Sequence, residues 1–315
     1  MLKIENIKLP PGADANQLTA EAARILRCPA KELHSLRILR RSVDAREEVS
    51  LVYTVEVSAA DEGSLLRRCR SKKVSRSQPK ASYQLPAPLP SPDIPPVVVG
   101  AGPAGLFAAL VLAHAGLRPI LLERGRRVED RAADVERFWQ TGVLDPASNV
   151  QFGEGGAGAF SDGKLNTGTR DIRHRFILEQ LVSCGAPQDI LIDAKPHVGT
   201  DYLHVVLRRL RQELTALGAD IRFESHLTDL EIRGGTLAGI TVEGPSGTYS
   251  LPCRQLVLCP GHSARDTFEM LFARGIVMEA KPFAVGIRIE HRQADCDAAQ
   301  YKHYAGHPGP PVSTY

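Results

Sequence analysis

The stretch VVVGAGPAGLFAALVLAHAGLRPILLE, residues 97–123, decides how the chain folds. Its leading valines predict a buried parallel strand, and the glycine turn Gly100–Gly105 follows them directly. Residues 103–115 are typical of a buried helix, and residues 118–123 form a second apolar strand that ends in Glu123. The order strand, glycine turn, helix and strand predicts a βαβ unit with a dinucleotide site at its turn.

Each glycine of the turn has its own chemical reason. Gly100 permits the tight turn, Gly102 lets the backbone approach a pyrophosphate, and Gly105 lets the helix pack closely on the strand. The helix directs its unpaired N–H groups toward the phosphates. Glu123 is placed to accept hydrogen bonds from ribose hydroxyls, which disfavours a 2′-phosphate. A glycine-rich turn in another α/β fold is the alternative, and it does not explain the full order of elements.

The fingerprint alone does not separate NAD from FAD, but two features favour FAD. Arg124 follows the acid directly and can lie beside the adenosine. A second glycine-rich loop, NVQFGEGGAGAFSDGKLNT at residues 149–167, lets backbone lie flat against a flat ligand, with Ser161, Lys164 and Asn166 as polar contacts. We interpret it as an ordered, ligand-facing loop rather than a flexible surface loop. An NAD-dependent dehydrogenase with a single Rossmann unit would leave this loop without a role.

The composition is that of a globular protein with room for two domains: 315 residues, 43% hydrophobic and 24% charged. It excludes a collagen, a coiled coil and a wholly disordered chain. A net charge of +3 is too small to indicate a nucleic-acid-binding protein. The basic run Arg67–Lys80 keeps that alternative open, but it lacks an aromatic residue to stack on bases. We therefore interpret the run as a solvated segment and expect no nucleic-acid partner.

Nothing in the sequence indicates a membrane or metal partner. The apolar stretch 97–122 contains glycines, prolines, His114 and Arg118, so a buried βαβ unit explains it better than a membrane-spanning helix. The amino terminus, MLKIENIKLPPG, has no apolar core and does not read as a secretory signal. The six cysteines form no CxxC pair and the ten histidines no HExxH motif. We expect a cytoplasmic protein with no metal site.

A proline-rich stretch divides the chain. Residues 84–96, QLPAPLPSPDIPP, predict an extended linker. We place a small α+β domain at residues 1–80, the linker at 81–96 and an FAD/NAD(P)-binding oxidoreductase domain at 97–315. The expected fold class is α/β, with a Rossmann-like nucleotide-binding domain that carries a β-meander insertion at residues 232–251.

The small domain reads as strand, helix, two strands and a helix. An apolar alternation with one slip at residues 2–9 predicts the first strand, and a helical apolar face covers residues 16–27. Strand-like patterns follow at 35–42 and 48–57, and a short helix at 62–69. A ferredoxin-like sandwich fits this order.

Several long motifs together resemble a known family: VVVGAGPAGLFAALVLA, ILLERG, SNVQFGEGGAGAFSDGKL, KPHVGTD, GHSARDTFEML and EAKPFAVGIRIEH. They are similar to uncharacterised FAD-dependent dehydrogenases, also described as NAD-utilising dehydrogenases or FAD-dependent oxidoreductases, over residues 95–307. The resemblance implies that FAD is bound by Gly100, Gly102, Pro103, Ala104, Gly105, Glu123, Arg124, Gly155, Gly156, Ala157, Ser161, Gly163, Lys164, Leu227 and Gly261.

The chain departs from this family pattern near its end. Such folds return late in the chain with a strand and a Gly-Asp turn that holds the ribityl and pyrophosphate groups. This sequence instead runs from His307 into PGPPVSTY. We therefore expect that the chain is truncated at its carboxyl terminus and that its flavin site is incomplete.

The resemblance implies an FAD-dependent oxidoreductase, a dehydrogenase that transfers hydride through its bound flavin, with NAD(P)H as the candidate electron donor. The alternative is a truncated, non-catalytic dinucleotide-binding module. Lys164, His262 and Arg265 are the side chains nominated near the chemistry, and no catalytic residue is assigned. The substrate is expected to be a small molecule, and the sequence identifies neither that molecule nor the oligomeric state.

Overall fold

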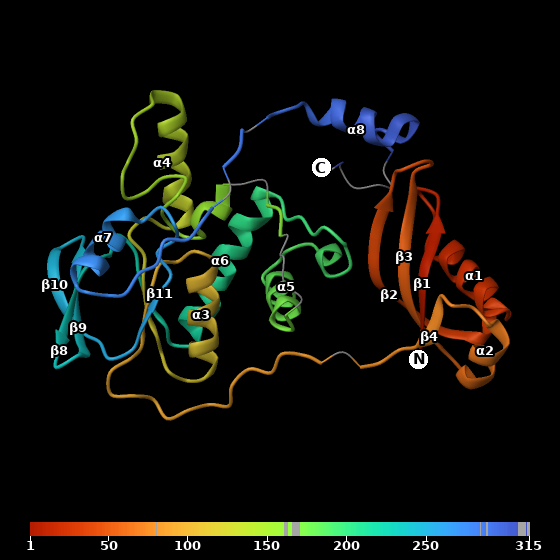
Figure 1. Cartoon of the computed structure of the whole chain (residues 1–315), viewed down its shortest axis with the longest axis horizontal. Coiled ribbons are helices and arrows are strands. Elements are labelled where there is room, and N and C mark those ends of the chain that lie inside the picture. Colours follow the sequence, from red (N-terminus) through yellow and green to blue (C-terminus); the bar gives the residue numbers. More distant parts are fainter. Residues whose placement is uncertain are drawn as a thin grey trace. The chain divides into compact units, whose positions relative to one another are not determined.

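The chain forms two compact units (Figure 1). The computed structural model describes residues 1–79, 81–160, 163–165, 171–283, 285–287, 289–307 and 313. The first unit holds Met1–Ala81, Gln188–Pro196 and Pro282–Tyr315, and the second holds Ser82–Pro187 and His197–Lys281. No sequence pattern indicated that residues 188–196 belong with the first unit. The domain boundaries given above remain a prediction.

The first unit is built on an antiparallel sheet with the strand order β2-β3-β1-β4. Its elements run β1 (Leu2–Leu9), α1 (Ala15–Leu26), η1 (Ala30–Glu32), β2 (Leu33–Asp44), β3 (Ser50–Ala59), α2 (Glu62–Cys69) and β4 (Val74–Arg76). Both helices lie on one face of the sheet (Figure 1). Buried side chains of α1 and α2, such as Leu26 and Leu65, pack there against Ile4, Val55 and Val57. The unit also contains η3 (Gln188–Leu191), α8 (Gln293–Tyr301) and η4 (Lys302–Tyr304).

The slip in the alternation of β1 is a β-bulge. The register of β1 against β3 shifts between Ile4 and Ile7, and Asn6 between them has a φ of +57°. The extra residue lets both isoleucines point into the core, where they are at most 1% exposed. Asparagine tolerates this left-handed conformation better than most residues.

The second unit contains a parallel sheet with the strand order β11-β5-β6-β7. Its strands are β5 (Val97–Val99), β6 (Ile120–Leu122), β7 (Asp220–Arg222) and β11 (Leu256–Leu258). The helix α3 (Pro103–His114) connects β5 to β6, so the predicted βαβ unit is present. β5 lies in the middle of the sheet and is buried on both faces, which explains its unbroken run of valines.

A three-stranded antiparallel meander packs against this sheet. Its strands are β8 (His226–Arg233), β9 (Thr236–Gly244) and β10 (Gly247–Pro252). Buried side chains of β8 and β9, among them Leu227 and Ile240, share one core with Val97 and Leu122 of the parallel sheet. The remaining elements are α4 (Val128–Thr141), η2 (Gly156–Phe160), α5 (Arg173–Ser183), α6 (Thr200–Ala216) and α7 (Arg265–Ala273). The fold is therefore mixed α/β, with parallel and antiparallel sheets.

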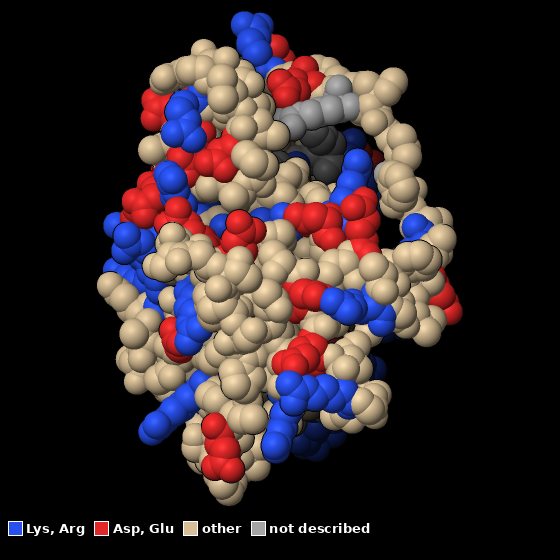
Figure 2. Space-filling view, turned by 90° about the vertical axis from the view of Figure 1, so that its left-hand side faces the viewer, with Lys and Arg blue, Asp and Glu red and all other residues tan. Residues whose placement is uncertain are grey.

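A bilayer-spanning helix is absent from the described ranges. The apolar stretch of residues 97–122 instead divides into β5, α3 and β6. On the face shown in Figure 2, basic and acidic side chains are interspersed rather than gathered by sign. Within the ranges described, no cluster of three or more His, Cys, Asp or Glu side chains is arranged to hold a metal ion.

Candidate dinucleotide-binding site

The turn after β5 leaves no room for side chains at two of its glycines. Gly100 has a φ of +97°, and a Cβ there would clash with the carbonyl oxygen of Cys259. A Cβ on Gly105 would clash with the carbonyl oxygen of Gly100. Gly102 differs, because a Cβ there would make only an ordinary contact with Gly156 at 3.8 Å. Gly100 and Gly105 are thus required by the shape of the turn. At Gly102 the absence of a side chain instead leaves the backbone open to a ligand.

The helix α3 begins at this turn without a side-chain cap. Gly102 is its N-cap and Pro103 its first residue, and no side chain of the described residues caps it. Pro103 has no N–H to leave unpaired, and its φ suits the start of a helix. The remaining first-turn N–H groups and the helix dipole favour an anion such as a phosphate.

A glycine-rich loop packs directly against the turn. The N–H of Gly155 donates to the carbonyl oxygen of Ala101 at 2.8 Å. A Cβ on Gly156 would lie 3.1 Å from the Cα of Gly102, so the two backbones nearly touch. Gly153, Gly155 and Gly156 all have positive φ angles, a conformation that glycine adopts without strain. The loop that the sequence predicted to face a ligand therefore lies beside the glycine turn.

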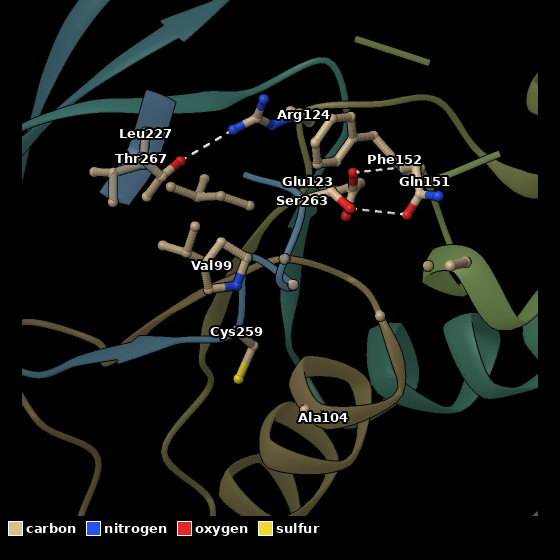
Figure 3. Close-up of a pocket in the computed structure, with 18 of the residues that line it drawn as sticks. Val99, Ala104, Glu123, Arg124, Gln151, Phe152, Leu227, Cys259, Ser263 and Thr267 are labelled. Carbon is tan, nitrogen blue, oxygen red and sulfur yellow. Dashed lines mark hydrogen bonds between the residues drawn. The ribbon is translucent and has the colours of Figure 1, made fainter. Parts of the chain in front are cut away.

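The turn and the loop together line a cavity of about 220 Å³ (Figure 3). Its wall includes many of the residues predicted to bind FAD: Gly100, Gly102, Pro103, Ala104, Glu123, Arg124, Gly156, Ala157, Leu227 and Gly261. His262 lines it too. Gln151, Phe152 and Gly153, which also line it, belong to the loop at residues 149–167 that the sequence predicted to face a ligand. Other wall residues were not predicted: Val99, Leu122, Ser225, His226, Cys259, Pro260, Ser263 and Thr267. Several of these directly flank a predicted residue in the sequence. The same motifs could therefore have indicated them.

The other predicted residues lie elsewhere. Gly105 lies beneath the turn, and a Cβ on Gly155 would clash with the Leu207 side chain of α6. Gly163 and Lys164 pair with Val198 and His197 and do not line the cavity, so their cofactor contact stays a prediction. Ser161 and Asn166 lie outside the described residues. Arg265 begins α7 and does not line the cavity.

Glu123 joins the turn to the loop. Its carboxylate is almost fully buried; Oε2 accepts from the N–H of Ala101 at 2.7 Å. Oε1 accepts from the N–H groups of Gly125 and Gly153, both at 2.9 Å. A carboxylate offers about four acceptor positions, so one remains on Oε2 for a ribose hydroxyl. The structure thus adds a structural role to the ligand role that the sequence predicted.

Arg124 is held in place by its neighbours rather than left free (Figure 3). Its guanidinium donates two hydrogen bonds to Asp266, both at 2.9 Å, and one to Thr267 Oγ1 at 3.0 Å. It also lies over the Phe152 ring, 4.3 Å from the centroid. Asp266 thus pairs with Arg124, 142 positions away, rather than with Arg265, its neighbour along the chain.

The Arg124 guanidinium also contacts His226. It lies 2.9 Å from Nε2 of the histidine, and Oδ2 of Asp266 lies 3.5 Å from the same nitrogen. Burial, and then the charge of Arg124, lower the pKa of His226 below its usual value. His226 is part of the cavity wall.

The loop before the glycines is wrapped around a buried arginine. Arg131 of α4 has no exposed surface and donates to four main-chain carbonyl oxygens. Its carbonyl partners are Asn149, Val150, Gly153 and Glu154, at 2.7–3.3 Å. Burial lowers the pKa of Arg131 to about 10. No sequence motif marked this residue, because its partners are main-chain groups about twenty positions away.

A second buried carboxylate, Glu154, lies behind the loop. Its Oε2 accepts from the N–H of Val128 at 2.8 Å and from Arg211 Nη1 at 2.7 Å. Its Oε1 has no hydrogen-bond partner among the described residues. Burial raises the pKa of Glu154 to about 7.

These features fit the adenosine diphosphate part of FAD. The uncapped start of α3 and the exposed backbone of Gly102 suit a pyrophosphate, and Glu123 retains an acceptor for a ribose. Val99 and Leu227 add an apolar surface for a planar base. Small-molecule sites usually occupy about 300–1,000 Å³, so a cavity of about 220 Å³ suits part of a dinucleotide better than the whole.

One relative matches nearly the whole chain. A protein of Clostridium beijerinckii described as uncharacterized is 42% identical over 309 residues, which make up 98% of this chain but 57% of that protein. The chain thus spans little more than half the length of that relative. Residues 1–59 match a domain of unknown function, DUF8436.

Solved structures resemble the chain only loosely. The THI4 protein of Thermovibrio ammonificans is 16% identical, with a TM-score of 0.40 over 58% of this chain and 64% of that one. The OxyS anhydrotetracycline hydroxylase of Streptomyces rimosus is 23% identical, with a TM-score of 0.33 over 56% of this chain and 33% of that one.

The family comparison coincides with the site. Residues 93–273 match the family described as FAD binding domain, and this range includes every residue that lines the cavity. The match spans more than half of the 315 residues. The chain therefore belongs to the FAD binding domain family, and its cofactor is FAD.

Proposed function

We propose that the chain is the FAD-binding part of a flavin-dependent oxidoreductase that acts on a small-molecule substrate. One observation carries the proposal: the Gly100–Gly105 turn and the loop at residues 153–157 pack together and line the same cavity, with Glu123 bonded to both. When bound, FAD supplies hydride and single-electron transfer.

The chain's own residues bind and orient this cofactor. The start of α3 and Gly102 receive the pyrophosphate, because no side chain shields them there. Glu123 Oε2 orients the ribose. Arg124, clamped between Asp266 and Phe152, stiffens the neighbouring wall rather than reaching toward the ligand.

The finer assignment is a dehydrogenase that passes hydride between the flavin and its substrate, with NADH or NADPH as electron donor. His262, which lines the cavity, is the nominated side chain nearest the site. A non-catalytic dinucleotide-binding module is the second candidate, favoured by the small cavity volume. A cytoplasmic location stays a prediction. For the first unit we infer a ferredoxin-like sandwich, since its elements run β-α-β-β-α-β.

Titration of the purified chain with FAD, followed by flavin absorbance and fluorescence, tests the proposal. We expect stoichiometric uptake by the wild type. Gly102→Val should weaken FAD binding at least about tenfold, a loss of about 1.4 kcal/mol, because the side chain would occupy the pyrophosphate approach. The fold should survive, since a Cβ at this position makes only an ordinary contact.

Gly286→Val is the matched control, because nothing lies within 4 Å of a Cβ at Gly286 and FAD binding should be unchanged. Bleaching of bound flavin by NADH or NADPH would support the dehydrogenase and name its donor. Uptake without bleaching by either donor would favour the non-catalytic module. Absence of uptake in excess FAD would contradict the proposal for this chain.

A further inference from the structure

The base of the cavity in the second unit belongs to a packed core. The ends of β5 and β6 and the start of β8 contribute Val99, Leu122 and Leu227, each at most 7% exposed. These side chains belong to the core that the parallel sheet shares with the meander. Because a close-packed core resists displacement, this part of the wall keeps its place.

The loop that supplies Gln151 to the wall is also anchored. The side-chain oxygen Oδ1 of Asn149 accepts from the N–H groups of Gln151 and Phe152 at 2.7 and 3.2 Å. The buried Arg131 donates to the carbonyl oxygen of Val150 at 3.1 Å. The Gln151 side chain therefore extends from a main chain that is fixed on both sides.

The segment at residues 260–263 is held less firmly. It connects β11 to α7, and all four of its residues line the cavity. Within the described part of the chain, Gly261 and His262 form no main-chain hydrogen bond. Gly261 has a φ of +78°, and nothing lies within 4 Å of a Cβ placed on it. Segments with so few contacts are displaced at low cost in free energy.

Two contacts join this segment and α7 to the anchored loop (Figure 3). The hydroxyl of Ser263 donates to Gln151 Oε1 at 3.0 Å, although the two residues are 112 positions apart. The second contact passes through Arg124, which is bonded to Asp266 of α7 and lies over the Phe152 ring. Ser263 and Gln151 both line the cavity, so their hydrogen bond joins two parts of its wall.

The size of the cavity indicates that part of its wall must move. Small-molecule sites usually occupy about 300–1,000 Å³, and this cavity has about 220 Å³. We propose that residues 260–263 form a gate that moves aside to admit FAD, and that the Gln151–Ser263 hydrogen bond holds the gate shut. This inference rests on the proposed FAD binding and adds to it the control of cofactor exchange.

A gate of this kind has a kinetic signature. Both partners of the hydrogen bond belong to the protein, so the bond forms with or without the cofactor. It therefore controls how fast FAD enters and leaves, because each passage requires the gate to open. The equilibrium affinity depends instead on the groups that contact FAD.

FAD exchange kinetics measured on the full chain test the gate. The variants are Ser263→Ala, Gln151→Met and the two combined. Association is followed by flavin fluorescence after rapid mixing, and dissociation by the same signal after dilution. The matched controls are Ser246→Ala, between β9 and β10, and Gln140→Met, on α4; both side chains are exposed and lie outside the cavity wall.

Each gate variant should raise both rate constants about fivefold, the effect of losing one hydrogen bond between neutral groups, and change the dissociation constant by less than about twofold. The double variant should be no faster than either single variant, because all three lose the same bond. Ser263→Thr keeps the hydroxyl and should retain the wild-type rates, as should both controls.

The remaining outcomes contradict the gate. Faster dissociation with unchanged association would mean that Ser263 and Gln151 contact FAD itself, and unchanged rates would mean that their hydrogen bond holds nothing in place. Either result, in a wild-type protein that takes up FAD, leaves the proposed function standing. Wild-type protein that takes up no FAD would refute the proposed function and the gate together.

Discussion

Arg131 keeps its positive charge inside the second unit by surrounding it with main-chain oxygens rather than a bonded carboxylate. The four carbonyl groups belong to the loop that supplies Gln151, Phe152 and Gly153 to the cavity wall. The Arg131 side chain also lies against the Phe160 ring, 4.8 Å from its centroid. A single residue on α4 therefore determines the path of the loop.

Replacing Arg131 with methionine should lower the free energy of unfolding by about 3 kcal/mol or more, because each hydrogen bond from a charged donor contributes about 1.5–3 kcal/mol and buried carbonyl groups would be left unpaired. Urea unfolding measures the change. Arg127→Met is the control. Arg127 is more than half exposed and, within the part of the chain that the structure describes, pairs with Asp130 alone, so its loss should matter little. Equal stability of the two variants would contradict the assigned role.

At the scale of elements, Glu154 joins the loop to two helices. It accepts from the first N–H of α4 and from Arg211 of α6, while its own N–H donates to the carbonyl oxygen of Arg126. The charged groups around it are Arg211, Arg131, Glu129 and Glu123. Burial outweighs the attraction of Arg211, so the pKa of Glu154 is raised in the folded state.

The buried Glu154 carboxyl predicts that the stability of the protein depends on pH. The pKa of Glu154 rises from 4.5 to about 7 on folding, so the folded state binds the proton more tightly than the unfolded state. The protonated Glu154 therefore adds to the free energy of unfolding. This contribution is complete below pH 4.5 and is lost as the pH rises toward about 7. At about 1.4 kcal/mol per pKa unit, the loss approaches about 3 kcal/mol.

Urea unfolding across this pH range checks the prediction. Glu154→Gln cannot ionise and should lack the decline, whereas Glu129→Gln, which alters a more exposed partner of the same Arg211, should keep it. Parallel pH profiles for the wild type and Glu154→Gln would refute the assignment.

At the scale of the whole molecule, the chain is two units joined by more than one crossing. FAD at a hundred times its dissociation constant should raise the free energy of unfolding of the second unit by about 2.7 kcal/mol. Native-state hydrogen exchange measures the two units separately. The amide of Val55 in β3 reports on the first unit and that of Val98 in β5 on the second, and both residues are fully buried. Protection that does not rise at Val98 would argue against FAD binding by this unit.

The sequence by itself determined the βαβ unit, the meander region and the glycine loop. These features depend on local rules: Gly100 and Gly105 fit where a Cβ would clash, and the valines of β5 read as a buried strand. The alternation in residues 2–9 likewise predicted β1, and the slip in that alternation corresponds to the bulge at Asn6. Local steric constraints favour particular residue types at neighbouring positions. They can therefore be recognised from the sequence alone.

Only the tertiary structure decided which distant residues meet. Asp266 pairs with Arg124 rather than with its neighbour Arg265, and Arg131 bonds to carbonyl groups that any residue type could supply. Residues 188–196 join the first unit through Arg41, more than 140 positions away. Such contacts depend on how packed elements bring side chains together, and main-chain partners leave no mark in the amino-acid sequence.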